Sequence, residues 1–145
     1  MKFIGLVSVL MLAAALSGCG GGSSGNINGN WTATLTNTGG TTALAFTTSF
    51  AQGSGTNLTV TNFAFTTSGE CFNSQTVTET GSFGFTGNFN GNVNGTFAMT
   101  IASTNNPSDV LTLQGTVSNG KITGTWSLTG GTTCTGNGNF TMTPM

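Results

Sequence analysis

Charged and acid–base side chains are nearly absent from this 145-residue chain. Lys and Arg together number two, Asp and Glu number three, and His and Tyr do not occur. Neutralising nucleic-acid phosphates requires clustered Lys or Arg, so no nucleic-acid partner is expected. The lack of His removes the commonest general base, and no nucleophile–base pair or phosphate-binding loop is found. The sequence therefore predicts a protein that is not an enzyme and has no catalytic residues and no cofactor.

Short runs of alternating apolar and polar residues make up most of the chain. Low charge with many Gly and Asn residues is also typical of disordered chains, but regularly spaced Phe, Leu, Val and Ile argue against disorder. Glycine-containing turns separate the runs. This pattern predicts an all-β domain of about eight consecutive antiparallel strands joined by short links.

The clearest pattern lies in residues 110–128, where an Asn-Gly dipeptide joins two alternating runs. Asn-Gly favours a two-residue hairpin turn, which sets the register of the two strands. Gly115 then falls opposite Gly124 and Leu113 opposite Trp126, with every apolar residue on one face. A one-residue slip would mix the faces, so the turn and the hydrophobic pattern agree on a sheet with one buried face.

Other links carry weaker signals of the same kind. The expected features are a two-residue turn at Gly39-Gly40 pairing Leu35 with Leu44, a three-residue loop at Gly53-Ser54-Gly55 pairing Phe50 with Leu58, a β-bulge near Thr61-Asn62, and an odd-length loop at Asn90-Gly91-Asn92.

Up-and-down strands with one apolar face close most simply into a barrel, because closure removes the unpaired edges. A two-sheet β-sandwich is the alternative. An eight-stranded barrel is just wide enough to be filled by side chains or to hold one small ligand, and the many inward-phased aromatic residues favour filling. Inner-face glycines fit strong strand coiling, or less readily the close approach of a ligand; these are Gly95, Gly115, Gly124, Gly136 and Gly138.

Strand parity places the third and seventh connections at the same end of such a barrel. Cys71 lies in the third and Cys134 beside the seventh, so a disulfide between them is expected in an exported protein. Glu70 and Asp109 fall at that end too, where a carboxylate pair could perform acid–base chemistry. Nothing in the sequence fixes their separation, and we expect two solvated loop acids. Spacing typical of calcium loops is absent, so no metal is expected.

Residues 1–18 have the features of a secretory signal, because Lys2 precedes an apolar run and small residues precede Cys19. The run is too short for a membrane span. Leu16-Ser17-Gly18-Cys19 resembles the lipobox of bacterial lipoproteins. The resemblance implies cleavage before Cys19, diacylglycerol on its sulfur and acylation of its amine.

The lipobox resemblance also implies a destination. Gly20 follows the lipidated position, and the lack of Asp there implies export to the outer membrane, on its periplasmic face or at the cell surface. Acyl chains at about 0.8 kcal/mol per buried methylene anchor a protein stably, so the membrane is the expected partner. Residues 19–28 then form the lipidated cysteine and a flexible tether, and 29–145 a single domain.

The motif Gly29-Asn30-Trp31 resembles the G-x-W start of lipocalins and avidins, and Gly124-Thr125-Trp126 is similar to it. Those families are eight-stranded barrels that bind small ligands in the mouth, which would make Trp31, Trp126, Gly115 and Gly124 ligand-facing. The basic residue that often packs on the lipocalin Trp is missing, as are the Tyr residues of avidin sites. The residue pattern by itself predicts that the two Trp side chains plug the core.

Three functional hypotheses follow. The leading one is a non-enzymatic, envelope-anchored lipoprotein with a structural or interaction role. The alternative is a small-ligand-binding barrel of the lipocalin or avidin type. A transmembrane barrel is the third hypothesis, and the lipid anchor and the missing Tyr girdle argue against it.

Overall fold

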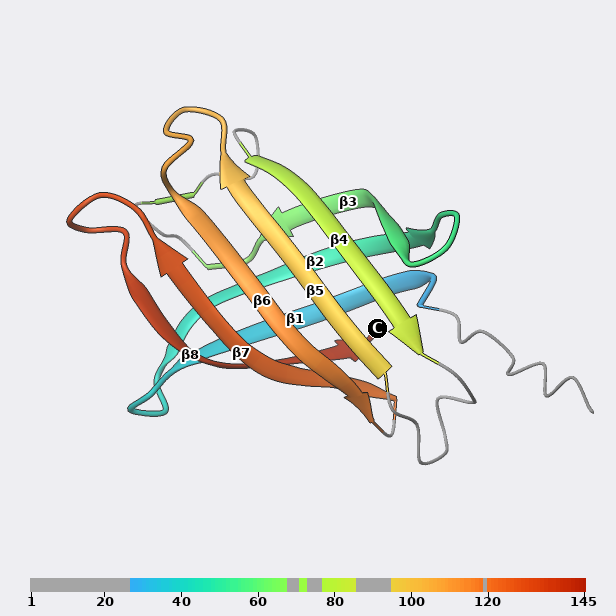
Figure 1. Ribbon diagram of the computed structural model, residues 1–145. Coiled ribbons are helices and arrows are strands. Elements are labelled where there is room, and N and C mark those ends of the chain that lie inside the picture. The colour runs from blue at the N-terminus through green and yellow to red at the C-terminus, as the bar shows by residue number, and fades with distance from the viewer. Residues whose placement is uncertain (1–26, 68–70, 73–76, 86–94, 119) are drawn as a thin grey trace, which may run out of the picture.

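The computed structural model describes residues 27–67, 71–72, 77–85, 95–118 and 120–145. The strands are β1 (Gly29–Asn37), β2 (Thr42–Gln52), β3 (Asn57–Phe65), β4 (Val77–Phe85), β5 (Gly95–Ser103), β6 (Val110–Ser118), β7 (Lys121–Thr129) and β8 (Gly136–Pro144). Each strand pairs antiparallel with the next, and β8 pairs with β1 (Figure 1). The predicted up-and-down barrel is confirmed, and the two-sheet sandwich is not adopted.

The β6–β7 hairpin has the register that its sequence predicts. Leu113 pairs with Trp126 and Gly115 with Gly124, and the ladder continues to Ser118 and Lys121 beside the turn. Gly120 has a φ of 71°, the left-handed conformation that glycine adopts without strain. Turn chemistry and hydrophobic pattern therefore cooperate in this hairpin.

The turn between β1 and β2 is wider than predicted. Leu35 pairs with Leu44 as expected, but Thr36 pairs with Thr42, which leaves Ala43 as an extra residue on β2. The Asn37 N–H donates to the Thr41 carbonyl at 2.8 Å, so three residues, 38–40, form the loop. A two-residue primed turn requires positive φ at both centres or at the first one, whereas only the second of the two glycines has it.

The β2–β3 loop has three residues, but it lies one position later than predicted. Gly53 N–H donates to the Asn57 carbonyl at 2.8 Å, and Phe50 pairs with Val60, not with Leu58. A shift of two residues keeps every side chain on the same face, so the hydrophobic pattern could not distinguish the two registers.

The predicted bulge in β3 is confirmed. Ser49 pairs with Asn62 and Phe50 with Val60, which leaves Thr61 as the extra residue. The loop predicted at 90–92 lies outside the described residues. In the described strands Phe83 pairs with Phe97, and both side chains face inward.

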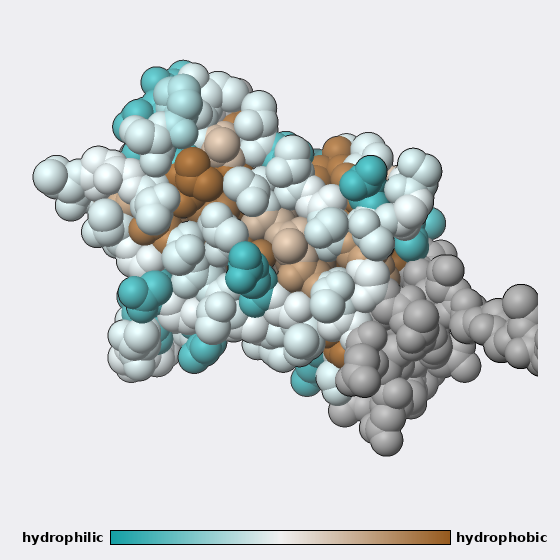
Figure 2. Space-filling view, viewed as in Figure 1, coloured by the Kyte–Doolittle hydropathy of each residue, from teal (hydrophilic) through white to brown (hydrophobic). Residues whose placement is uncertain are grey.

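Inward-facing side chains fill the barrel. The largest fully buried ones are Phe46, Phe83, Phe140, Ile27, Leu35, Met99, Ile101, Leu111, Leu113, Ile122, Met142 and Val117. Ile27 belongs to the segment expected to be tether, yet it is buried, and the adjacent Asn28 side chain accepts a hydrogen bond from the Gln52 N–H. The folded body of the protein therefore includes these two residues. Figure 2 shows the outside, where apolar residues form separate patches among weakly polar ones.

The side chain of Trp126 lies across two glycines of the neighbouring strand. Trp126 of β7 covers Gly136 and Gly138 of β8, and its indole N–H donates to the Thr36 carbonyl of β1 at 2.9 Å. A Cβ added to Gly138 would overlap the Thr36 carbonyl oxygen and lie 2.9 Å from the indole nitrogen. The inner glycines therefore permit close strand approach and aromatic cover, as the curvature interpretation predicts.

Replacing Gly138 by Ala is expected to lower the free energy of unfolding by about 3 kcal/mol, from overpacking and loss of the Trp126–Thr36 hydrogen bond. Urea unfolding monitored by Trp fluorescence measures this change. Gly39→Ala is the control, because a Cβ there meets nothing within 4 Å and no positive φ is involved. Equal stability of the two variants would contradict the proposed role of the close approach.

Candidate functional site

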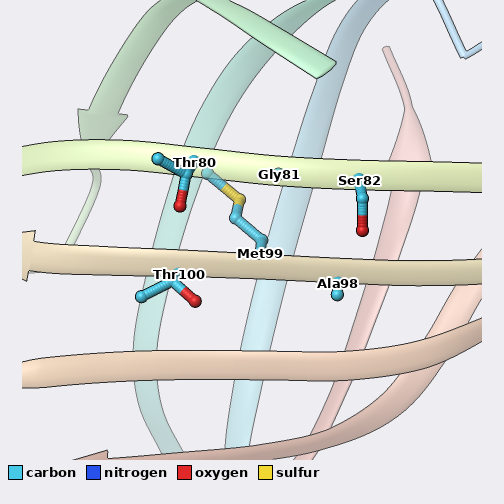
Figure 3. Close-up of a pocket in the computed structure, with 6 residues that line it drawn as sticks. All are labelled: Thr80, Gly81, Ser82, Ala98, Met99 and Thr100. Carbon is cyan, nitrogen blue, oxygen red and sulfur yellow. The ribbon is translucent and has the colours of Figure 1, made fainter. Parts of the chain in front are cut away.

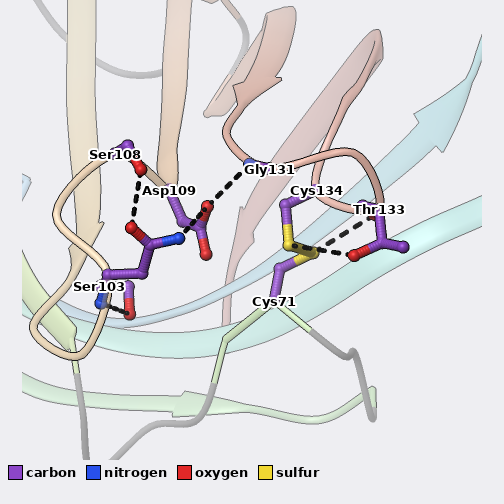
Figure 4. Close-up of a disulfide and its surroundings, with 8 residues drawn as sticks. Cys71, Ser103, Ser108, Asp109, Gly131, Thr133 and Cys134 are labelled. Carbon is purple, nitrogen blue, oxygen red and sulfur yellow. Dashed lines mark hydrogen bonds between the residues drawn. A yellow bond between two sulfur atoms is a disulfide. The ribbon is translucent and has the colours of Figure 1, made fainter.

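The predicted disulfide joins Cys71 to Cys134 at one end of the barrel (Figure 4). The two Cα atoms lie 5.5 Å apart although 63 residues separate them in the chain. The bond links the β3–β4 connection to the β7–β8 loop. Cys134 is buried and its N–H donates to the Gly131 carbonyl at 2.9 Å, whereas Cys71 is partly exposed.

Asp109 is a buried structural residue and not the solvated loop acid that we expected. It is 6% exposed, and its Oδ1 accepts hydrogen bonds from Asn106 Nδ2 at 3.0 Å and from the Gly131 N–H at 3.1 Å (Figure 4). The carboxylate thereby ties the β5–β6 loop to the β7–β8 loop. Glu70, its suggested partner, lies outside the described residues.

The four candidate ligand-facing residues are occupied by contacts within the barrel. Trp31 and Trp126 are each 3% exposed, and the Trp31 indole N–H donates to the Ile27 carbonyl at 2.8 Å. Gly115 and Gly124 pair with each other; a Cβ on Gly115 would lie 2.8 Å from the Phe140 ring, and one on Gly124 would overlap the backbone of β6. All four residues are therefore held in contacts with other parts of the barrel.

The β3–β4 seam is the weakest junction of the barrel. Only two residue pairs join these strands, Asn57 with Ser82 and Leu58 with Gly81, whereas each of the other junctions has seven to nine. Within the described residues, 59–65 of β3 and 77–80 of β4 do not pair with each other. A bulge bends its strand and increases the local twist, so the bulge at Thr61 accounts for the divergence.

Aromatic side chains pack beside this opening. Phe65 stacks on Phe72 with ring centroids 5.6 Å apart, and it meets Phe63 edge-on at 5.0 Å. Phe46 of β2 contacts both Phe63 and Phe65. The cluster of Phe46, Phe63, Phe65 and Phe72 thus covers the core at the disulfide end, and Phe63 and Phe65 are only partly buried.

Glu79 also lies at the β3–β4 seam. It pairs with the fully buried Ile101 and shares the inner face of β4 with Phe83. Burial raises the pKa of its carboxyl above the usual value of 4.5, although a hydrogen bond from its own backbone N–H acts in the opposite direction. Glu79 matches no sequence motif, but its two-residue spacing from Gly81 and Phe83 places it on the inner face of β4.

A shallow depression of about 230 Å³ lies on the outer surface of β4 and β5 (Figure 3). Small polar and apolar residues border it: Thr80, Gly81, Ser82, Ala98, Met99 and Thr100. The described residues that border it offer hydroxyl groups, backbone and small apolar side chains.

No group of three or more His, Cys, Asp or Glu side chains that could hold a metal ion occurs in the described part of the chain. The same residues include no helix with the length and hydrophobicity needed to cross a membrane. No family model, characterised protein or solved structure was found to match the sequence. The candidate site is therefore defined by geometry alone. It lies at the disulfide end of the barrel and has two features, the β3–β4 seam with Glu79 and the loop contacts of Asp109.

Replacing Glu79 by Gln is expected to stabilise the protein at pH 7 by about 0.5 kcal/mol, a value reduced for partial exposure. The raised folded-state pKa means that the folded protein holds the proton more tightly than the unfolded chain does. The stabilisation that this bound proton gives the folded state is complete below about pH 4.5. It is lost as the pH rises through the folded-state pKa of Glu79. Urea unfolding at pH 4 and pH 7 should therefore show the variant's advantage at pH 7 only.

Lys121→Gln is the control for a general charge effect, because that side chain is exposed. An equal gain of the Glu79 variant at both pH values would contradict a titrating carboxylate as the cause.

Replacing Asp109 by Ala is expected to lower the free energy of unfolding by about 1–3 kcal/mol, since two donors would lose their acceptor in a buried site. Asp109→Asn keeps one acceptor oxygen and should lose less. Thermal unfolding of both variants gives the comparison. Unchanged stability of the Ala variant would show that the loop contacts do not hold this end together.

Proposed function

We propose that this protein is a non-enzymatic lipoprotein of a bacterial envelope, anchored by lipid on Cys19, with a structural or interaction role. The packing of the barrel interior carries this proposal. Inward-facing aromatic and aliphatic side chains occupy the space in which a ligand-binding barrel holds its ligand. The surface available to a partner is therefore the outer face and the loops.

The chemistry of the outer face supports an interaction role with an uncharged partner. Outward-facing threonines of five neighbouring strands pair in one row across the sheet: Thr96, Thr116, Thr123, Thr141 and Thr34. Neighbouring strands lie about 4.8 Å apart, so the row presents closely spaced hydroxyl and methyl groups. This outer face can form hydrogen bonds but exerts little long-range electrostatic attraction. It therefore suits contact with the surface of an uncharged partner better than capture of a diffusing ion.

Binding of a small apolar ligand is the second candidate function. The partly buried Phe63 and Phe65 beside the β3–β4 seam favour it, because they are apolar groups next to a junction with little backbone pairing. A ligand there would enter through the wall of the barrel and not through the mouth, unlike in the families that the sequence motif resembles.

The anchor is tested by the intact mass of the mature protein extracted from membranes in detergent. We expect loss of residues 1–18, added lipid, and two hydrogens fewer than the reduced chain. Cys19→Ala should abolish lipid addition and release the protein from the membrane fraction, whereas Ser24→Ala should change neither. Membrane retention of the Cys19 variant would exclude a lipid anchor at this residue.

Native mass spectrometry of the same preparation separates the two candidate functions. A filled structural barrel should appear without a non-covalent adduct after the detergent is stripped. A reproducible adduct that is lost in Phe63→Ala, and retained in the control Val117→Ala, would favour the ligand-binding barrel.

A further inference from the structure

Among the described residues, 59–65 of β3 and 77–80 of β4 face each other across the seam without pairing. Pairing ends at Leu58 and Gly81, and the Phe83 N–H donates to the Thr56 carbonyl at 2.7 Å on the far side of these residues. All hydrogen bonds that the ladder contributes between β3 and β4 therefore lie at the end of the barrel opposite the disulfide. Segments 59–65 and 77–80 need another restraint at the disulfide end.

The connection that follows β3 supplies this restraint. After β3 the chain remains beside β2, where the Thr66 N–H donates to the Ala45 carbonyl at 2.8 Å. It then reaches Cys71 and Phe72, which cover the end of the barrel: Phe72 is 6% exposed and stacks on Phe65. The bond from Cys71 to Cys134 ties the described residues of this segment covalently to the other side of the barrel.

The partner side of that bond is held firmly. The loop carrying Cys134 is fixed by the Cys134 N–H to Gly131 carbonyl bond and by the Gly131 N–H bond to Asp109. Asp109 in turn belongs to the loop between β5 and β6, strands joined by eight pairs. The disulfide thus fastens the weakly paired side of the barrel to its strongly paired side.

The geometry points to a redox-sensitive device: reduction of Cys71–Cys134 opens the β3–β4 seam while the other seven junctions stay closed. The opening would release Phe72 from the end of the barrel and uncover Phe63 and Phe65. This inference concerns the seam and is independent of the lipid anchor and of the role proposed above.

The reducing step is a thiol–disulfide exchange with a dithiol reductant. A thiolate of the reductant attacks Sγ of Cys71, the more exposed of the two residues, and Cys134 leaves as a thiolate. The second thiol of the reductant then attacks the mixed disulfide and releases Cys71. The reductant ends as a disulfide, and the protein gains two electrons and two protons.

Glu79 is placed to keep the opened seam from pairing with other chains. An inward-pointing charge on an unpaired strand is one of the ways in which proteins prevent edge-to-edge association. Opening would therefore expose aromatic side chains without offering β4 as a free template.

Hydrogen exchange of the full mature chain in detergent, measured with and without dithiothreitol, tests the inference. Pepsin is the protease, because Lys and Arg are too few for trypsin to give useful peptides. Amides of 57–58 and 81–83, the residues paired or hydrogen-bonded across the seam, should exchange at least about tenfold faster after reduction, and those of 110–128 should stay within about twofold. A uniform increase along the chain, or no increase in the seam, would overturn the inference.

A double variant, Cys71→Ser with Cys134→Ser, should give the reduced pattern without dithiothreitol. Val117→Ala, which weakens the core of the β6–β7 hairpin, controls for general loss of stability and should not speed exchange in the seam selectively. If the double variant does not fold, near-ultraviolet circular dichroism of the reduced natural chain distinguishes opening of the seam from unfolding of the whole barrel. Trp31 and Trp126 lie on β1 and β7, so their signal should persist, and its loss would mean that the whole barrel unfolds.

Discussion

Barrel closure depends on how closely the strands β6, β7, β8 and β1 approach one another. Trp126 reaches from β7 across Gly138 of β8 to the Thr36 carbonyl of β1, so one side chain joins three strands. Phe140 lies in the same way against Gly115, whose partner is Gly124. Any Cβ at these glycines would meet backbone or ring atoms. The tight coiling that brings β8 back to β1 therefore requires both the glycines and the aromatic residues that cover them.

The opposite wall of the barrel, at the β3–β4 seam, is less completely paired. The bulge at Thr61 bends β3 and increases its local twist while β3 stays paired with β2. Pairing with β4 is then limited to the residues around Leu58. Aromatic packing and the Cys71–Cys134 bond replace the missing ladder at the disulfide end. One wall is thus closed by backbone hydrogen bonds, and the other largely by side chains.

Sequence reasoning succeeded where two independent signals coincide. In the β6–β7 hairpin the Asn-Gly turn and the alternation of side chains demand one register, and the barrel has it. At Gly53 only the alternation was informative, and a register two residues away satisfies it equally well. Strand parity predicted the disulfide, because the order of the strands alone decides which connections lie at the same end of an up-and-down barrel. The burial of Asp109 depends on the conformation of two loops, which side-chain periodicity does not encode. Glu79 was overlooked because a single carboxylate matches no motif.

The scarcity of charge links the fold to the proposed role. A domain whose outward residues are mainly Thr, Asn and Ser gains little solubility from net charge, and its described ionisable groups are Glu79, Asp109 and Lys121. Two of these three are wholly or partly buried, so the exposed surface is almost uncharged. Such a surface tends to associate when the protein diffuses freely. The proposed lipid on Cys19 would attach the protein to a membrane, so it would not need to stay dissolved as a freely diffusing molecule, and this composition fits the anchored barrel that we propose.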